Sequence, residues 1–147
     1  MIDPLTVGLN GLLGLNVVEE DRDTVRMDMP VSSSCLQPFG FVHGGATLAL
    51  LEAAASRGAE LRCNLGCERP FGTHVDITHV KNCRQGTVHG TAVFESEQDL
   101  GERGTRQTWR VQATDDSGAV MSTGTLETRI VPLAYLESKS NARKANE

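Results

Sequence analysis

The sequence lacks the features that mark membrane, secreted and nucleic-acid-binding proteins. No apolar run in its 147 residues approaches the roughly 20 residues that a membrane-spanning helix needs. The N-terminus has no basic flank ahead of an apolar stretch, so we expect no signal peptide. The 14 Lys and Arg residues are scattered along the chain, and the net charge is −5. We therefore expect a cytoplasmic protein with neither a nucleic-acid nor a membrane partner.

Metal-site signatures are also missing. Cysteine occurs only at positions 35, 63, 67 and 83. Cys63 and Cys67 are separated by three residues, and His74, His79 and Cys83 follow, but this spacing matches no common zinc signature. Without a Cys-x-x-Cys knuckle, the cysteines are interpreted as the free thiols of a cytoplasmic protein. We therefore expect no metal ion.

Two further enzyme classes are excluded by what the sequence lacks. There is no glycine-rich phosphate loop and no dinucleotide fingerprint, so we expect no cofactor. The cluster Ser32-Ser33-Ser34 lacks the flanking glycines of a nucleophile elbow. A serine hydrolase is therefore not predicted.

What the sequence does contain is one long apolar helix among strands. Residues 44–61 are dominated by Ala and Leu and contain no Pro, which predicts a helix that is apolar nearly all round and buried. Residues 5–13 favour a short amphipathic helix. Alternating apolar and polar residues predict strands at about 15–20, 25–31, 74–81, 87–95, 106–113 and 120–131.

The order of these elements predicts the α+β class in a single domain. Hydrophobic residues make up 39% and charged residues 22%, as is ordinary for a globular protein. We place the domain at residues 1–131. Residues 132–147 are polar and are interpreted as a flexible C-terminal tail. One antiparallel sheet wrapped around the helix would cover much of it, and a second subunit could cover the rest.

The segment that joins a strand to this helix carries candidate catalytic groups. It contains the amide of Gln37, the imidazole of His43 and the glycines Gly44 and Gly45. Gly44 falls where the helix should begin, and N–H groups there lack internal partners and lie at the positive end of the macrodipole. A carbonyl oxygen at this point would be polarised and an oxyanion stabilised. The same residues also fit a plain glycine turn in which His43 caps the helix.

Glu52 is the only ionisable residue between Gly44 and Ser56. A carboxylate on a buried helix is costly unless it is paired or hydrogen-bonded, which points to a function. Ser56 lies one turn further on and could orient it. Gly44 and Glu52 are about 12 Å apart along the helix axis, too far to serve one carbonyl within one chain. The alternative is an exposed Glu on a thin polar stripe.

These residues together resemble a known family. Gln37-Pro38-Phe39-Gly40, then His43-Gly44-Gly45, with Glu52 nine residues after the histidine, is similar to the PaaI-like hotdog-fold acyl-CoA thioesterases. The similarity is strongest to the branch that hydrolyses hydroxybenzoyl-CoA and dihydroxynaphthoyl-CoA. The segment Thr73–His79 is similar to the next strand of that branch, and the whole resemblance covers about residues 12–131.

The resemblance implies a fold, a reaction and an assembly. The hotdog fold is an antiparallel sheet wrapped around a long central helix. The reaction is hydrolysis of an acyl-CoA substrate to the free acid and CoA. The family forms homodimers by edge-to-edge pairing of sheets, usually two to a homotetramer, with active sites between subunits. This placement agrees with the distance between Gly44 and Glu52.

The resemblance also implies catalytic roles. Glu52 is the nucleophile or general base. The Gly44 amide polarises the thioester carbonyl, assisted by His43. Gln37 contacts the thioester region, and Ser56 orients the attacking group.

Further substrate contacts are expected at four positions. His79 lines the acyl pocket, although a lone histidine among apolar strand positions is more often a hydrogen-bonded core residue. Gly45, Phe39 and Lys81 are the others. Two positions depart from the family pattern, because Thr78 stands where an Asn often precedes the histidine and Lys81 stands where an Arg is common. These departures affect the acyl pocket and the CoA phosphate contacts and leave the reaction class unchanged.

Two alternatives stay open. One is a hotdog hydratase or dehydratase acting on acyl thioesters, although its motifs are absent. The other is a non-catalytic acyl-CoA-binding module, which should lack the acidic residue on the helix. One Trp, one Tyr and four Phe do not identify the acyl group, and the sequence does not separate CoA thioesters from carrier-protein thioesters.

Overall fold

The computed structural model describes residues 6–146, which form six strands, three α-helices and two short 3-10 helices. In chain order they are α1 (Gly8–Leu13), β1 (Asn16–Glu20), β2 (Thr24–Pro30), η1 (Ser33–Cys35), α2 (Gly44–Leu61), β3 (Glu68–His79), β4 (Thr87–Asp99), η2 (Gly101–Arg103), β5 (Thr105–Thr114), β6 (Val120–Pro132) and α3 (Leu133–Lys144).

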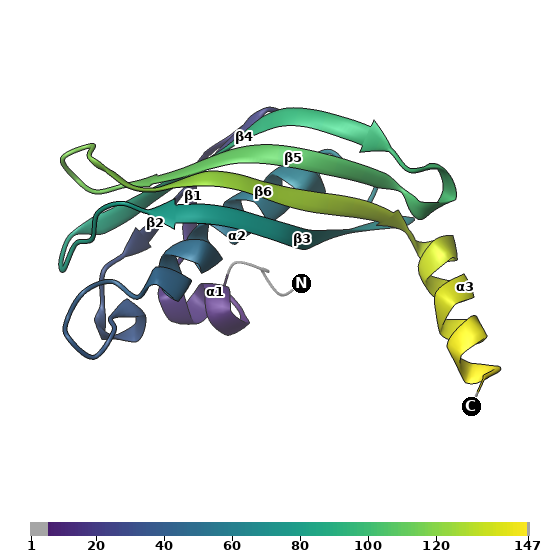
Figure 1. Ribbon diagram of the computed structural model, residues 1–147, viewed down its shortest axis with the longest axis horizontal. Coiled ribbons are helices and arrows are strands. Elements are labelled where there is room, and N and C mark those ends of the chain that lie inside the picture. Colours follow the sequence, from purple (N-terminus) through teal and green to yellow (C-terminus); the bar gives the residue numbers. More distant parts are fainter. Residues whose placement is uncertain (1–5, 147) are drawn as a thin grey trace.

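The six strands form one antiparallel sheet in the order β1-β2-β4-β5-β6-β3. Figure 1 shows that the sheet curves over α2, while α1 lies on the same side. The strands β1 and β3 are the two edges. The predicted α+β class, with an antiparallel sheet wrapped around one long helix, is confirmed.

The core lies between the concave face of the sheet and α2. Strand residues alternate between the two faces of a sheet, so every second residue of β2 and β5 points at the helix. Burying each large apolar side chain of this kind stabilises the fold by about 1.5–3 kcal/mol. The completely buried residues include Val25, Met27, Met29, Trp109, Val111 and Ala113 from the sheet, and Leu50, Leu51, Ala54 and Ala55 from α2.

A close approach between α2 and β5 fixes the height of the helix over the sheet. A Cβ atom on Gly58 would overlap the indole of Trp109, with its Cζ2 atom at 3.0 Å. The Trp109 Nε1–H in turn donates to the Thr128 hydroxyl at 2.9 Å, so the buried indole has no unpaired polar atom. Glycine is therefore required in the last turn of α2 for reasons of space.

The sheet covers α2 on one side only. Eight residues of α2 are buried, whereas Glu52 is exposed and Leu48, Ala49, Ala53 and Ser56 are half-buried. The single chain therefore buries part of α2, and burial of the rest by a second subunit stays a prediction. Away from the sheet, α1 contacts α2 and covers only part of the remaining face among residues 6–146.

The edge strand β3 begins at Glu68, whereas the sequence pattern predicted a strand from His74. The sequence pattern missed the residues before His74 because Pro70 argues against a strand. An edge strand tolerates proline because the missing N–H can face away from the neighbouring strand. Pro70 pairs with Ile130 of β6. β3 also exposes two large apolar side chains, Phe71 at 47% and Val75 at 40%.

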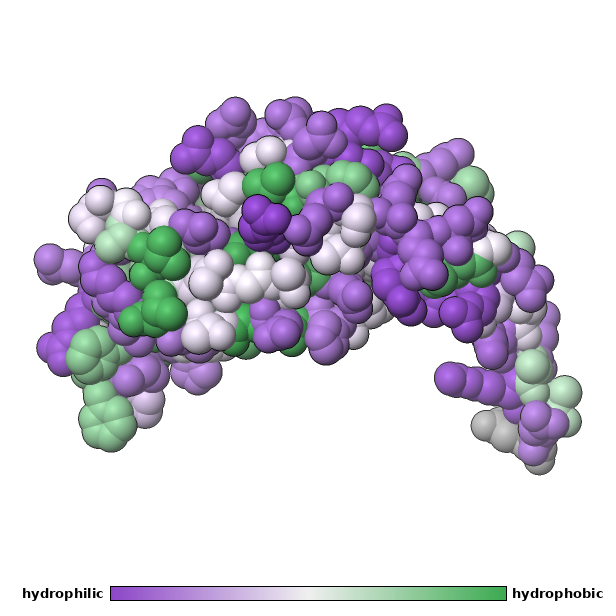
Figure 2. Space-filling model, turned by 45° about the horizontal axis from the view of Figure 1, so that its top comes forward, coloured by the Kyte–Doolittle hydropathy of each residue, from purple (hydrophilic) through white to green (hydrophobic). Residues whose placement is uncertain are grey.

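The polar C-terminal residues form α3, a helix that the sequence analysis did not predict. α3 contains no buried residue and extends from the end of β6 away from the sheet (Figure 1). The separation of residues 132–147 from the domain, and their flexibility, stay predictions. Figure 2 shows one face of the molecule as mainly hydrophilic, with small apolar patches. No helix among residues 6–146 is long and apolar enough to cross a membrane.

The predicted N-terminal helix is present in a shorter form, since α1 begins at Gly8. The predicted start at residue 5 lies outside the described residues. The four cysteines are free thiols, as predicted. Within residues 6–146, no three His, Cys, Asp or Glu side chains gather where they could hold a metal ion.

Candidate active site

The loop before α2 is held in a tight turn that places Gln37 next to the helix N-terminus. The Gln37 N–H donates to the Phe41 carbonyl at 2.8 Å, and the Gly40 N–H donates to the Gln37 carbonyl at 3.0 Å. Gly40 has a φ of +83°, which favours glycine at this turn. The Gln37 amide oxygen accepts a hydrogen bond from the Phe39 N–H, so the side chain folds back on its own turn.

His43 caps α2, as one of the two sequence interpretations expected. Its Nδ1 atom accepts a hydrogen bond from the Gly45 N–H at 2.8 Å. A neutral imidazole that accepts at Nδ1 carries its proton on Nε2, so His43 retains one N–H for another acceptor. The cap uses the Gly45 amide and leaves the Gly44 amide without an acceptor among residues 6–146. The free Gly44 N–H lies at the positive end of the helix macrodipole.

A cavity of about 220 Å³ opens directly beside this free amide. It lies between the start of α2, the end of β3 and the start of β6. Four predicted site residues meet in it, namely Gln37, Gly44, His79 and Lys81. The other residues that line it are Val42, Thr47, Asn82, Met121 and Ser122.

His79 is fixed in this cavity by a neighbour that sequence reasoning missed. The His79 Nδ1 atom lies 2.6 Å from the hydroxyl oxygen of Ser122, which is 1% exposed. The His79 Nε2 atom faces Gly44, where an added Cβ atom would lie only 2.9 Å from it. The two residues of this pair are directly opposite each other on β3 and β6. No local sequence signal marks Ser122, because strand pairing alone brings it beside His79.

Lys81 stands at the rim of the cavity and forms an ion pair with Asp115. The hydrogen bond from the Lys81 ammonium, followed by that from Ser117, holds the pKa of the Asp115 carboxyl well below its usual range. Asp115 therefore neutralises much of the positive charge of Lys81, the residue that was expected to contact the substrate.

Glu52 lies outside this cavity, two turns further along α2. Its exposed carboxylate rests against β3 at Gly72, where an added Cβ atom would lie 3.1 Å from the Glu52 Cδ atom. Ser56 is half-buried one turn away, and no hydrogen bond joins it to Glu52 within the described residues. One chain therefore brings Gln37, Gly44 and His79 together without Glu52.

Two other predicted site residues border a different cavity. His43 and Gly45 border a second cavity of about 220 Å³, whose further lining is mainly apolar: Leu9, Leu13, Ser34, Leu36, Ala46 and Ala49. Phe39 lines neither of these two cavities, and its side chain is 80% exposed.

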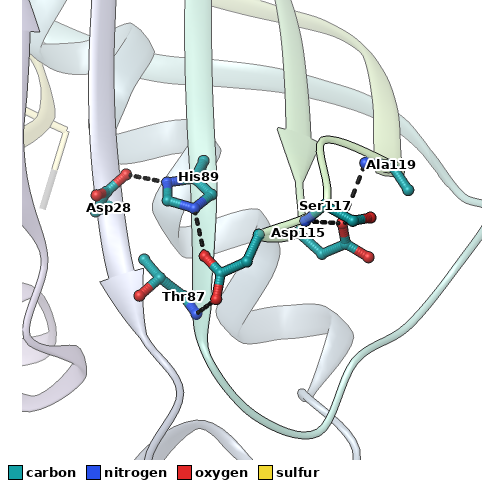
Figure 3. Close-up of polar contacts among 7 residues, drawn as sticks. Asp28, Thr87, His89, Asp115, Ser117 and Ala119 are labelled. Atoms are coloured by element: carbon teal, nitrogen blue, oxygen red, sulfur yellow. Dashed lines mark hydrogen bonds and ion pairs between the residues drawn. The ribbon is translucent and has the colours of Figure 1, made fainter.

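A separate polar cluster lies on the outer face of the sheet (Figure 3). His89 of β4 places its Nδ1 atom 2.7 Å from the Asp28 carboxylate and its Nε2 atom 2.7 Å from the Asp116 carboxylate. Asp116 also accepts a hydrogen bond from the Thr87 N–H at 3.2 Å. The hydrogen bond to Asp116, followed by that to Asp28, raises the pKa of His89, while partial burial acts in the opposite direction. The cluster joins β2, β4 and the β5–β6 turn.

Comparisons with known proteins identify the family of the chain. The model of the thioesterase superfamily matches residues 39–122. The 1,4-dihydroxy-2-naphthoyl-CoA hydrolase of Escherichia coli (strain K12) is 32% identical over 121 residues, which cover 82% of this chain and 85% of that protein.

Two solved structures show the same fold. A variant of the thioesterase PA1618 from Pseudomonas aeruginosa has a TM-score of 0.78 and 26% identity, covering 87% of this chain and 88% of that chain. The Escherichia coli PaaI protein has a TM-score of 0.67 at 14% identity, covering 81% and 80% of the two chains, and this likeness concerns the fold alone. The predicted resemblance to the PaaI-like hotdog proteins is thereby confirmed. The chain belongs to the thioesterase superfamily and is a hotdog-fold thioester hydrolase.

Proposed function

We propose that this protein hydrolyses an acyl-CoA to the free acid and CoA, with the Gly44 N–H polarising the thioester carbonyl and Glu52 as nucleophile or general base. The observation that carries the proposal is the free Gly44 amide, which opens into a cavity at the positive end of α2. Such a donor stabilises the oxyanion that forms when the thioester carbon is attacked. The similarity to a 1,4-dihydroxy-2-naphthoyl-CoA hydrolase supports a CoA thioester as substrate.

Two side chains assist the carbonyl end of the reaction. His43 has its Nε2–H available, because Nδ1 is already occupied by the Gly45 N–H. In this proposal His43 donates that N–H to the same carbonyl oxygen, as the resemblance to the family implies. Gln37 is held next to the same helix end and contacts the thioester region.

Glu52 acts from a second copy of the chain. The rise between Gly44 and Glu52 is about 12 Å, whereas attacking group and oxyanion donor must both approach one carbonyl within about 3–3.5 Å. The exposed edge β3, beside Glu52, carries the apolar side chains Phe71 and Val75 and has no covering element among residues 6–146. Pairing of two β3 edges buries these side chains and gives a homodimer. Two such dimers make the proposed homotetramer.

Two reaction routes convert the acyl-CoA and water to the free acid and CoA. In the first, the Glu52 carboxylate attacks the thioester carbon, the C–S bond breaks, and water hydrolyses the resulting anhydride. In the second, Glu52 removes a proton from water, whose oxygen attacks the same carbon. In both routes CoA leaves as the thiol. After a single turnover in ¹⁸O-water, label in the Glu52 carboxylate together with an unlabelled acid identifies an anhydride that water opens at the Glu52 carbon, because the general-base route places the label in the acid.

The acyl group is proposed to be apolar, and aromatic in keeping with the branch that the sequence resembles. The mainly apolar cavity bordered by His43 and Gly45 supports this choice, since leucine and alanine side chains line it. The proposal retains a cytoplasmic location, in line with the sequence analysis.

The direct test is release of free thiol from a panel of aromatic and aliphatic acyl-CoAs, followed with a thiol-detecting reagent. We expect hydrolysis of at least one aromatic acyl-CoA. Glu52→Ala and Glu52→Gln should reduce kcat by about 10²- to 10⁴-fold with the fold intact, as circular dichroism would report. A Glu52→Ala variant with most of the wild-type rate refutes the assignment of Glu52. Loss of enoyl absorbance without thiol release indicates a hydratase instead.

A further inference from the structure

The Glu52 carboxylate rests on a gap in the side chains of β3, at Gly72. A Cβ atom built on Gly72 would lie 3.1 Å from the Glu52 Cδ atom and 3.4 Å from its Cγ atom, and closer still to Oε1. Gly72 is not among the glycines with positive φ, so its backbone conformation does not require glycine. Space for the carboxylate is therefore what this position supplies.

The local geometry of β3 makes this gap a defined feature. The register of β3 against β6 shifts here, because Gly72 pairs with Thr128 and His74 pairs with Glu127. Thr73 is thus the extra residue of a bulge, and bulges re-aim the side chains of the strand that carries them. α2 contacts β3, which is an edge strand of the sheet that curves over α2 in Figure 1.

Within the described part of the chain, nothing else holds the carboxylate. Among residues 6–146, no hydrogen bond or ion pair to the Glu52 side chain is found. The exposed carboxylate therefore rests in space that the missing side chain of Gly72 leaves open. An added methyl group would displace the end of the side chain at little cost to folding, because the Glu52 side chain can swing toward solvent.

We propose that Gly72 is a positioning residue, which sets the place of the Glu52 carboxylate for attack on the thioester. The proposal rests on the function proposed above for Glu52. It extends that function from α2 to a residue of β3, the edge strand that pairs with the second copy in the proposed dimer. A packing role alone would give a different result, because it predicts a loss of stability rather than of turnover.

The test is Gly72→Ala, with Thr73→Ala as the matched control on the same bulge. The Thr73 hydroxyl donates to the Glu127 carbonyl at 3.3 Å, away from the Glu52 side chain. We expect Gly72→Ala to lower kcat about 10- to 100-fold, since a displacement on the order of 1 Å can have that effect. KM, melting temperature and the molecular mass in light scattering should stay near the wild-type values. Thr73→Ala should retain close to the wild-type kcat.

A readout independent of activity keeps the two proposals distinguishable. In protein labelled with ¹³C at the glutamate carboxyl carbons, the Glu52 signal is assigned by its absence from Glu52→Gln. We expect this signal to move in Gly72→Ala and to stay unchanged in Thr73→Ala. An unmoved signal together with unchanged kcat overturns the role of Gly72. An unmoved signal with a changed molecular mass overturns it as well, because Gly72 would then act on assembly.

The function of Glu52 is judged separately. A fully active Glu52→Ala variant refutes the proposed function, and with it the catalytic meaning of Gly72. The carboxyl signal still reports in that case whether Gly72 positions the side chain. An inactive Glu52→Ala with a fully active Gly72→Ala refutes the positioning role alone.

Discussion

The substitution Gly44→Ala, at the N-terminus of α2, should lower kcat and leave the stability of the fold nearly unchanged. The new Cβ atom would lie 2.9 Å from the His79 Nε2 atom, and 3.4 and 3.5 Å from two ring carbons. The ring cannot retreat freely, because Ser122 holds it through a 2.6 Å hydrogen bond. The substitution must therefore shift either the imidazole or the first turn of α2.

The two effects on stability nearly cancel. Disturbing the hydrogen bond between His79 and Ser122 costs about 1 kcal/mol. Replacing Gly by Ala in a helix returns up to about 1 kcal/mol. The net change should move the melting temperature by no more than about 2–4 °C, the shift that 1 kcal/mol causes in a domain of this size.

No second effect offsets the loss of kcat. The substitution moves the Gly44 N–H rather than removing it, so we expect the lower part of the range for loss of an oxyanion donor, about 10²-fold in kcat. That factor corresponds to about 2.7 kcal/mol of transition-state stabilisation. Thiol release at saturating acyl-CoA gives kcat, and thermal unfolding gives the stability.

The double variant Gly44→Ala, His79→Ala identifies the steric origin of any stability change. Without the imidazole, the new methyl group meets no ring, so the stability effect of Gly44→Ala should change between the two backgrounds. Wild-type kcat in Gly44→Ala, at unchanged stability, refutes the assignment of its amide as the oxyanion donor.

Three other outcomes follow from the same structure. Ser122→Ala removes the partner of His79 and should lower kcat on the order of tenfold, the value of one hydrogen bond, at a near-native melting temperature; unchanged kcat argues against a role for the ring orientation. The raised pKa of His89 stabilises the fold fully below pH about 6.5, and this contribution is lost as pH rises through the higher folded-state pKa. Urea unfolding should therefore show a steeper loss of stability toward alkaline pH in the wild type than in His89→Asn, and equal slopes would contradict this. Val75→Lys places a charge on the exposed β3 edge and should shift the protein toward monomer in light scattering, with a parallel loss of activity; a wild-type protein that is itself an active monomer rules out the dimer.

The sequence predicted the elements whose signals are local. The bounds of α2, Gly44–Leu61, match the prediction because a stretch rich in Ala and Leu, without proline, follows a glycine pair. The cap by His43 was one of two local alternatives. The hydrogen bond from the Gly45 N–H supports the cap and leaves the Gly44 N–H free, so the oxyanion alternative stays a prediction.

Features that depend on position in the sheet were not predictable in this way. The early part of β3 was missed because Pro70 argues against a strand until its place at an edge is known. Ser122 and Gly72 acquire roles only through pairing with distant segments. The exposure of Glu52 in one chain has the same cause, since a sequence pattern gives the polarity of a helix face without showing what covers it. α3 was missed because its polar composition gives no apolar stripe.

The most direct test of the composite active site is complementation between two damaged proteins. Glu52→Ala lacks the attacking group, and the double variant Gln37→Ala, His43→Ala lacks side chains around the oxyanion. Mixed dimers formed by subunit exchange contain one site with both defects and one intact site. The account predicts that activity rises above that of either parent as exchange, followed by mass spectrometry, proceeds. Activity that stays at the parental level after complete exchange contradicts it.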